Sequence, residues 1–246
     1  MGKGTHIIID PDASAYAEAH TTAEDATLYA LNRWAHLHTA QPQMMAGAYQ
    51  GRLLHLLCAA MQPRVVVELG SFVGYSTICL ARGLAADGRL FAIEAEEEYE
   101  PCLRRHLHEA GVDDRVEVCI GRASEVLPTL DVEVDLAYVD ADKTNSLSYY
   151  EALLPKMRRG GMIVVDNVFW GGKVLSAEAD NDRDTRTMRE LNDHIQSDPR
   201  VENLLLPVRD GLMLCRVLGA DGDDAGLCGL ASSQKEEAGV AAEKIK

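Results

Sequence analysis

The stretch VVVELGSFVGYS, Val65 to Ser76, decides the fold class of this chain. Its first five residues are nearly all apolar, which is typical of a strand buried on both faces of a parallel sheet. Gly70 and Gly74 follow, and a helical stretch begins there. Glycines between a strand and a helix let the backbone approach a nucleotide-like ligand closely. The GxxxG spacing differs from the GxGxxG of dinucleotide-binding proteins, and no GxxxxGK[ST] phosphate loop is present.

Beyond this stretch, short apolar runs alternate with helical stretches, as in the βα units of a parallel sheet. We predict strands at 65–69, 90–93, 116–120, 134–139 and 162–165, and helices near 74–86, 96–110, 123–130, 145–158 and 183–197. Residues 201–207 and 212–217 flank an Asp-Gly pair, which is a strong hairpin signal. The sheet should therefore be mostly parallel and end in an antiparallel hairpin.

Three helices are predicted before residue 62, at 13–20, 22–38 and 44–61. Thr22 followed by Asp25 resembles a capped start for the second, and Pro42 separates the second from the third. Residues after Val217 are rich in Gly, Ala and Glu without apolar periodicity. We therefore divide the chain into an N-terminal helical part (1–62), a catalytic core (63–218) and a mobile tail (219–246).

The composition limits the partners of this chain. A formal net charge of −15 argues against indiscriminate binding to nucleic acid or to an anionic membrane. The six cysteines form no CxxC pair and mostly lie in apolar runs, which indicates free thiols in a reducing compartment. No stretch is long enough to span a membrane, so we expect a cytoplasmic protein.

Polar side chains follow two predicted strands where each strand ends. Asp140, Asp142 and Lys143 come after the fourth strand, and Asp166 and Asn167 come after the fifth. The carboxyl ends of parallel strands share one edge of the sheet, so these groups should lie close together. Carboxylate and amide oxygens suit Mg²⁺ or a similar cation. The alternative is that the aspartates cap a helix or a turn and the lysine is a solvated charge.

These groups suit methyl transfer from a sulfonium to oxygen. A neutral phenol or enol oxygen is a poor nucleophile, and a cation would stabilise and orient its oxyanion. Lys143 could accept the proton. Glu94 ends the second strand, where a carboxylate can accept both hydroxyl protons of a ribose, and together with Glu68 and Gly70 it suits an adenosyl ligand.

Three aromatic or imidazole side chains are weaker candidates. Trp170 could form a wall for a planar acceptor, or it could simply pack on the fold. His36 and His38 lie two residues apart on a predicted helix and point away from each other, so we interpret them as ordinary polar positions.

From about Thr22 to Val217 the sequence resembles the cation-dependent class I O-methyltransferases, the family that includes catechol and caffeoyl-CoA O-methyltransferases. The matching stretches are MMAGAYQG (44–51), ELG to GYS (68–76), IE (93–94), GRA (121–123), DADK (140–143), DN (166–167) and RDGL (209–212). The resemblance implies a Rossmann-like fold, with a mostly parallel seven-stranded sheet and helices on both faces. It also implies S-adenosylmethionine as methyl donor, a homodimer, and N-terminal helices that cover the active site.

The resemblance carries over to individual residues. It implies a donor pocket lined by Met44, Ala46, Glu68, Gly70, Ser76, Glu94, Ala123 and Asp140. It implies Asp140, Asp166 and Asn167 as metal ligands, with Asp140 and Lys143 as the catalytic pair and Lys143 as general base. Two features depart from the family. Arg122 stands where a small residue is expected, and no residue clearly matches the additional acid that holds the second hydroxyl in the animal catechol enzyme.

The leading hypothesis is O-methylation of a vicinal dihydroxy, catechol-like small molecule. The alternative is methylation of 5-hydroxyuridine at the wobble position of tRNA, which needs a basic patch. The candidates for such a patch are Arg33, Arg52, Arg104, Arg105, Arg158 and Arg159. A nicotinamide-dependent dehydrogenase is disfavoured by the missing GxGxxG, and a non-catalytic binding protein by the presence of the metal ligands and the base.

Overall fold

A twisted seven-stranded sheet forms the centre of the computed structural model, which describes residues 10–176 and 181–219. Its order is β3-β2-β1-β4-β5-β7-β6. The strands are β1 (Val65–Leu69), β2 (Arg89–Glu94), β3 (Val116–Ile120), β4 (Val134–Val139), β5 (Met157–Asp166), β6 (Val201–Leu206) and β7 (Leu212–Val217). Strands β1 to β5 pair in parallel, and β7 is antiparallel to both β5 and β6. The predicted Rossmann-like α/β class with a C-terminal antiparallel hairpin is confirmed.

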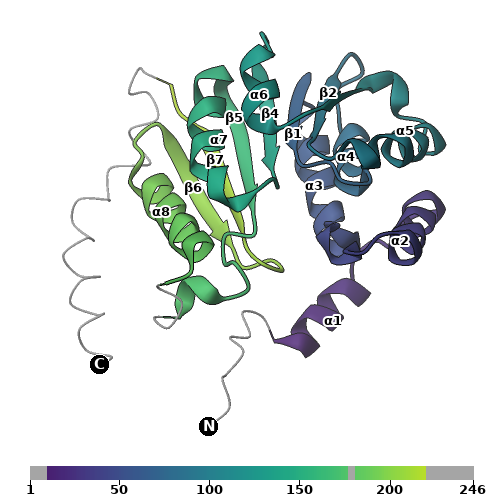
Figure 1. Ribbon diagram of the computed structural model, residues 1–246, viewed down its shortest axis with the longest axis horizontal. Coiled ribbons are helices and arrows are strands. Elements are labelled where there is room, and N and C mark those ends of the chain that lie inside the picture. The colour runs from purple at the N-terminus through teal and green to yellow at the C-terminus, as the bar shows by residue number, and fades with distance from the viewer. Residues whose placement is uncertain (1–9, 177–180, 220–246) are drawn as a thin grey trace.

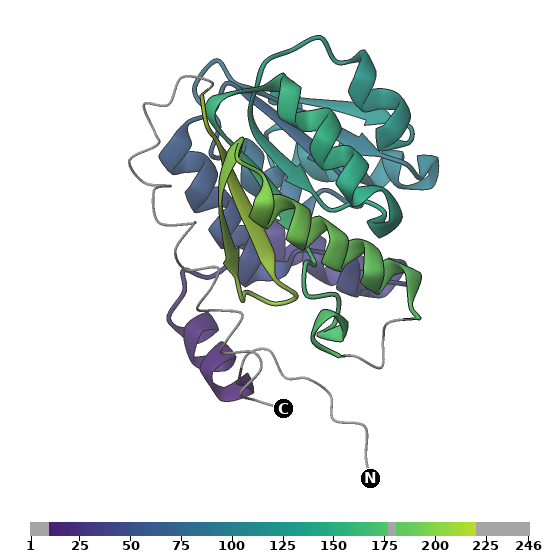
Figure 2. The same ribbon diagram turned by 90° about the vertical axis from the view of Figure 1, so that its left-hand side faces the viewer.

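Helices cover both faces of this sheet (Figure 1). The α-helices of the described residues are α1 (Pro11–Ala19), α2 (Ala26–His38), α3 (Gly47–Met61), α4 (Tyr75–Ala81), α5 (Glu100–Glu109), α6 (Ala123–Val126), α7 (Ser146–Leu153) and α8 (Arg183–Ser197). Helices α2 to α5 pack on one face and α6 to α8 on the other. In Figures 1 and 2, α1 lies apart from this body, and none of its residues is buried.

The central strands are apolar on both faces because each face meets a helical layer. Val66 and Val164 pack toward α2–α5, whereas their neighbours Val67 and Val165 pack toward α6–α8. Alternate residues of a strand point to opposite faces, so a doubly covered strand has to be apolar throughout.

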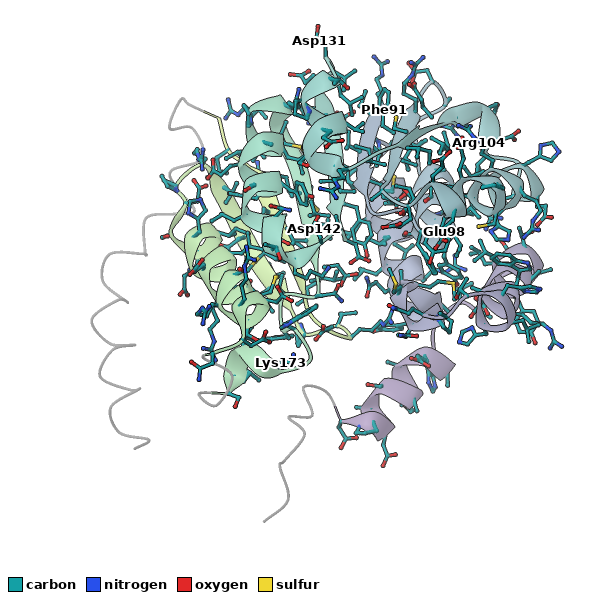
Figure 3. All side chains as sticks on the ribbon, viewed as in Figure 1. Phe91, Glu98, Arg104, Asp131, Asp142 and Lys173 are labelled. Carbon is teal, nitrogen blue, oxygen red and sulfur yellow. The ribbon has the colours of Figure 1, made fainter. Side chains whose placement is uncertain are left out.

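The strand register places the candidate residues side by side. Leu69 pairs with both Ile93 and Val139, and Val139 pairs with Val165. The residues that come next, Gly70, Glu94, Asp140 and Asp166, therefore share the carboxyl edge of the sheet. Figure 3 shows the two edges: Asp131, before β4, and Lys173, after β5, lie at opposite ends of the molecule.

The second helix begins later than predicted. Asp25, and not Thr22, is its N-cap, because the Asp25 carboxylate accepts hydrogen bonds from the backbone N–H groups of Thr27 and Leu28, each at 3.0 Å. The prediction failed because serine, threonine and aspartate are all good N-caps, and only tertiary packing chooses between them.

The fourth βα unit also differs from the prediction. Helix α7 ends at Leu153, a 3-10 turn spans Leu154–Lys156, and β5 already begins at Met157 instead of residue 162. Pro155 lies in that turn, where its missing N–H costs nothing. The two arginines and two glycines of residues 158–161 hid the start of the strand, since they break its apolar pattern.

Five of the six cysteines lie in the described part of the chain, and all five are free thiols. Cys58, Cys79 and Cys215 are buried free thiols, while Cys102 and Cys119 are free and only half-buried. Cys228 and the predicted tail, apart from Gly219, lie outside the described residues. No helix in the described part of the chain is long and apolar enough to cross a membrane.

Candidate active site

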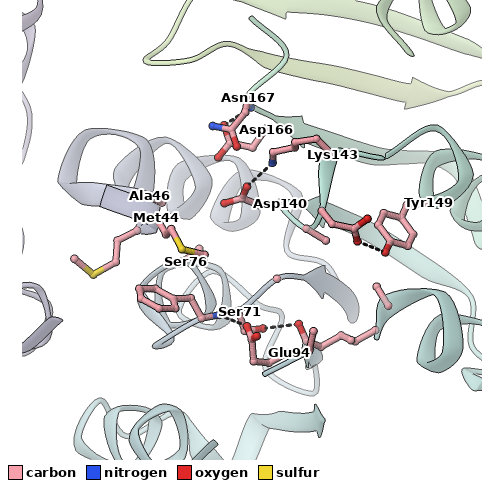
Figure 4. Close-up of a pocket in the computed structure, with 18 of the residues that line it drawn as sticks. Met44, Ala46, Ser71, Ser76, Glu94, Asp140, Lys143, Tyr149, Asp166 and Asn167 are labelled. Atoms are coloured by element: carbon pink, nitrogen blue, oxygen red, sulfur yellow. Dashed lines mark hydrogen bonds and ion pairs between the residues drawn. The ribbon is translucent and has the colours of Figure 1, made fainter. Parts of the chain in front are cut away.

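A cavity of about 880 Å³ opens at the carboxyl edge of the sheet. Its lining comes from the loops after β1, β2, β3, β4 and β5, from the segment before α3 and from the β6–β7 loop. Most of the predicted site residues line it, namely Met44, Ala46, Gly70, Ser76, Glu94, Ala123, Asp140, Lys143, Asp166, Asn167 and Trp170. Figure 4 shows the carboxylates of β4 and β5 on one side of this cavity and Ser71 with Glu94 on the other.

Gly70 allows the loops after β1 and β4 to meet. Its φ of +92° lies in the left-handed region, which favours glycine. A Cβ at this position would lie 2.1 Å from the carbonyl oxygen of Asp140, much closer than any real contact. The backbone N–H of Asp140 donates to the Leu69 carbonyl at 2.8 Å. A glycine is therefore needed for Asp140 to sit next to the glycine turn.

The Glu94 carboxylate is fixed at the other end of the cavity. One oxygen accepts a hydrogen bond from the Phe72 N–H at 2.6 Å, and the other accepts one from the Glu96 N–H at 2.9 Å. Its side chain is buried but belongs to the cavity lining. An oriented carboxylate of this kind can still accept hydrogen bonds from hydroxyl groups of a ligand.

Glu68 is the predicted donor residue that does not line the cavity. It is fully buried beneath the glycine turn, where Oε2 accepts hydrogen bonds from Thr77 at 2.5 Å and Ser71 at 3.1 Å. Burial raises the pKa of this carboxyl to about 7. The structure therefore places Glu68 beneath the turn, which it supports, and outside the residues that line the cavity.

Asp140 and Lys143, which both line the cavity, form a half-buried ion pair. The Lys143 Nζ lies 2.9 Å from Asp140 Oδ1, and the lysine side chain is only 11% exposed. A solvated lysine would be largely exposed, so the alternative interpretation of Lys143 as a surface charge is wrong. Asp142 is exposed and accepts hydrogen bonds from Tyr149 and Asn145, each at 2.5 Å.

Asp166 faces Asp140 across the β4–β5 register. Its Oδ2 accepts hydrogen bonds from Gln50 Nε2 at 2.5 Å and from the Tyr138 hydroxyl at 2.6 Å, and its Oδ1 accepts one from the Asn167 N–H at 2.6 Å. Burial, together with the negative charge of Asp140, raises the pKa of the Asp166 carboxyl to about 6. Two carboxylates and an amide thus converge on one side of the cavity, with Lys143 as a neighbouring positive charge (Figure 4).

Among the lining residues that were not predicted from the sequence, two bear directly on the geometry of the site. One is Gln50, which is buried and binds Asp166. The other is Arg209, whose Nη1 donates to the carbonyl oxygens of Met45 and Ala46. Both lie in stretches that match the family, 44–51 and 209–212, and that match is the signal that could have identified them.

The remaining ionisable candidates have structural roles. His36 and His38 each bind a backbone carbonyl four residues earlier through Nδ1, at 2.9 and 2.8 Å, and neither lines the cavity. Of the arginines considered for a tRNA-binding patch, Arg104 is paired with Glu100 and Arg158 with Asp135.

A second group of potential metal ligands, Glu151, His194 and Asp198, lies on α7 and at the end of α8. The guanidinium of Arg200 binds both carboxylates of this group, at 2.6 and 2.7 Å. A cation already occupies the position between them, so this group is an ion-pair network.

The family model described as O-methyltransferase matches residues 13–218. A catechol O-methyltransferase of Mycobacterium tuberculosis is 39% identical over 188 residues, which cover 75% of this chain and 84% of that protein. Caffeoyl-CoA O-methyltransferase 1 of Eucalyptus globulus is 33% identical, over 70% of this chain and 74% of that protein.

Solved structures agree with these sequence matches. The O-methyltransferase TomG from Streptomyces achromogenes, solved in complex with SAM, superposes with a TM-score of 0.76 at 34% identity, covering 85% of this chain and 96% of TomG. The chain therefore belongs to the O-methyltransferase family. The predicted enzyme class, an S-adenosylmethionine-dependent O-methyltransferase, is confirmed at the level of this family. Metal dependence, the homodimer and the cytoplasmic location remain predictions.

Proposed function

We propose that this enzyme uses a divalent cation to transfer the methyl group of S-adenosylmethionine to one hydroxyl of a vicinal dihydroxy, catechol-like small molecule. The observation that carries the proposal is the convergence of Asp140, Asp166 and Asn167 beside Lys143 in the cavity that also contains Glu94. Relatives named for catechol and caffeoyl-CoA methylation support the same class of acceptor.

The donor fits the end of the cavity that contains Glu94. The fixed Glu94 carboxylate can accept the two ribose hydroxyls, and Ala123, buried at the start of α6, leaves room for a flat adenine. Met44 and Ala46 border the cavity from the segment before α3, and Ser76 borders it from α4. A donor bound here would share the cavity with the carboxylates of Asp140 and Asp166.

The residues present fit a divalent cation. Asp140, Asp166 and Asn167 supply only oxygen ligands, the type that Mg²⁺ prefers, and leave coordination positions for an acceptor. Two carboxylates at adjoining register positions repel each other, and Asp166 is almost fully buried. A divalent cation held there would relieve this repulsion, stabilise the oxyanion of the acceptor and orient it for displacement.

Lys143 is placed to take the proton of the acceptor. Its Nζ is held by Asp140 Oδ1 at 2.9 Å and lies inside the cavity, largely out of water. In the transfer, a bond forms between the acceptor oxygen and the methyl carbon while the carbon–sulfur bond breaks. The electron pair of the carbon–sulfur bond returns to sulfur. The hydroxyl proton moves to Lys143, which acts as base in its neutral amine form after its ammonium proton has left to solvent.

A small acceptor suits the space and the charge of the site better than tRNA does. A volume of about 880 Å³ is near the upper end for small-molecule sites, so the donor and a single aromatic ring can fit together. Trp170 lines the cavity next to Asn167, where its indole can cover one face of such a ring. The acidic chain and the paired arginines offer no observation in favour of tRNA.

A panel of related phenols tests the acceptor. Catechol, resorcinol and phenol differ only in the number and spacing of their hydroxyl groups, so resorcinol and phenol serve as matched controls. With labelled S-adenosylmethionine and Mg²⁺, we expect methylation of catechol and little product from the other two. Equal rates with phenol and catechol would show that a second neighbouring oxygen is not recognised, and the proposed acceptor class would be wrong.

A further inference from the structure

A buried hydrogen-bond network holds Asp166 from beneath the cavity. Gln50 on α3 donates through Nε2 to Asp166 Oδ2 at 2.5 Å and to the Tyr138 hydroxyl oxygen at 2.9 Å. Tyr138, on β4, donates its own hydroxyl proton to the same Asp166 Oδ2 at 2.6 Å. Gln50 borders the cavity, whereas Tyr138 lies behind it in the packed layer between the sheet and α2–α5.

The position of Tyr138 is unusual for a hydroxyl. Strand β4 lies between β1 and β5 in the middle of the sheet, and its neighbours Ala137 and Val139 are buried and apolar. The Tyr138 side chain is itself 0% exposed. A hydroxyl placed in such surroundings is costly unless it is paired, and a partly satisfied network is worse than an apolar core. Tyr138 satisfies its hydroxyl entirely through Asp166 and Gln50.

The network leaves Asp166 one free acceptor position. An ionised carboxylate has about four acceptor positions. Three of those of Asp166 are used, by Gln50, Tyr138 and the Asn167 N–H. The side chain cannot rotate without breaking these bonds. The remaining position is therefore held in one orientation on the side of the cavity where Asp140 and Asn167 lie (Figure 4).

We propose that Tyr138 and Gln50 are positioning residues that hold Asp166 in the orientation in which it binds the divalent cation. This inference rests on the proposed metal site, but it concerns two residues that do not supply the ligands themselves. Partners that hydrogen-bond to a ligating carboxylate typically change metal affinity by about 10–100-fold when they are removed. Tyr138→Phe removes one hydroxyl and almost no volume, so it isolates this effect.

The structure offers a matched control in Tyr150 of α7. Tyr150 is also 0% exposed, and its hydroxyl also donates to a carboxylate, Asp198 Oδ2, at 2.8 Å. Neither Tyr150 nor Asp198 lines the cavity. Tyr150→Phe therefore makes the same chemical change in a similar environment, away from the proposed metal site.

The test is Mg²⁺ binding to the metal-free protein by isothermal titration calorimetry, which does not depend on catalysis. We expect Tyr138→Phe to bind Mg²⁺ about 10–100-fold more weakly than the wild type, and Tyr150→Phe to bind it with wild-type affinity. Gln50→Met, which keeps the volume and loses the amide, should weaken binding as well. It provides a second measurement if Tyr138→Phe does not fold.

Two outcomes would overturn the inference, and they are distinguishable. If the wild type binds Mg²⁺ and both Tyr138→Phe and Gln50→Met bind it equally well, the network does not position the ligand, while the proposed metal site stands. If the wild type itself binds no Mg²⁺, the metal site of the proposed function fails and this inference fails with it.

Discussion

Gly70→Ala is the substitution for which the structure gives the clearest magnitude. Alanine at a φ of +92° is strained by about 1–2 kcal/mol, because its Cβ crowds its own backbone in the left-handed region. The same Cβ would also lie 2.1 Å from the Asp140 carbonyl oxygen. Relieving such an overlap by backbone movement costs about 1–3 kcal/mol more. We therefore expect the free energy of unfolding to fall by about 2–5 kcal/mol, which many domains can lose and still fold.

Gly111→Ala is the matched control for this change. Gly111 has a φ of +65°, but a Cβ built there would meet no heavy atom within 4 Å. Only the backbone strain applies, so the loss should be about 1–2 kcal/mol. The difference between the two variants measures the contact between the loops after β1 and β4.

Urea unfolding and initial rates of methyl transfer test this prediction together. The overlap in Gly70→Ala can be relieved only by moving the backbone of Asp140 or Gly70, and a misplacement of about 1 Å at a reacting centre can cost about 100-fold in rate. Gly111→Ala should keep the wild-type rate. If Gly70→Ala is as stable and as active as Gly111→Ala, the loop contact does not position Asp140.

Three further substitutions test other parts of the site. Lys143→Met should lower the methyl-transfer rate by about 10²–10⁴-fold, the usual contribution of a general base, without changing donor affinity measured by calorimetry. Arg209→Met removes the hydrogen bonds to the Met45 and Ala46 carbonyls, worth about 1.5–3 kcal/mol each for a charged donor, and should raise KM for S-adenosylmethionine. Glu68→Gln should flatten the pH dependence of stability in the metal-free protein. The pKa of Glu68 rises from 4.5 unfolded to about 7 folded, so its contribution of roughly 3 kcal/mol is complete below pH 4.5 and is lost as pH rises through 7.

Each of these expectations has a result that would contradict it. A Lys143→Met enzyme with the wild-type rate would exclude Lys143 as the base. An unchanged KM for the donor in Arg209→Met would show that the segment before α3 keeps its position without this arginine. For Glu68→Gln, the contradicting result is a free energy of unfolding, measured in urea between pH 5 and pH 8, that changes with pH as steeply as in the wild type.

The sequence was sufficient to predict the adjacency of Asp140, Asp166 and Asn167. Each of these residues follows an apolar run, and the carboxyl ends of parallel strands share one edge, so the pattern alone brings them together. The hairpin was equally predictable, because the Asp-Gly pair separates two apolar runs. These features depend on local pattern and on a general rule of sheet topology.

The contacts made by Gln50 and Glu68 depend on tertiary packing and could not be predicted from the sequence. Gln50 on α3 reaches Asp166 through tertiary packing, and no spacing in the sequence indicates this contact. Tyr138 reaches Asp166 because β4 and β5 pair, with Tyr138 opposite Val164. Glu68 was predicted to line the donor pocket, yet Thr77 and Ser71 hold it beneath the turn. The apolar pattern of a strand shows which residues lie near the edge of the sheet. It does not show on which side of the following turn a given side chain lies.

The central claim is that methyl transfer to a catechol depends on a divalent cation held at Asp140 and Asp166. The most direct test is the rate of transfer from labelled S-adenosylmethionine to catechol by protein stripped with EDTA and then titrated with Mg²⁺. We predict no transfer in EDTA and a saturable recovery of monomethylated product as Mg²⁺ is added. A full rate in EDTA would contradict the claim.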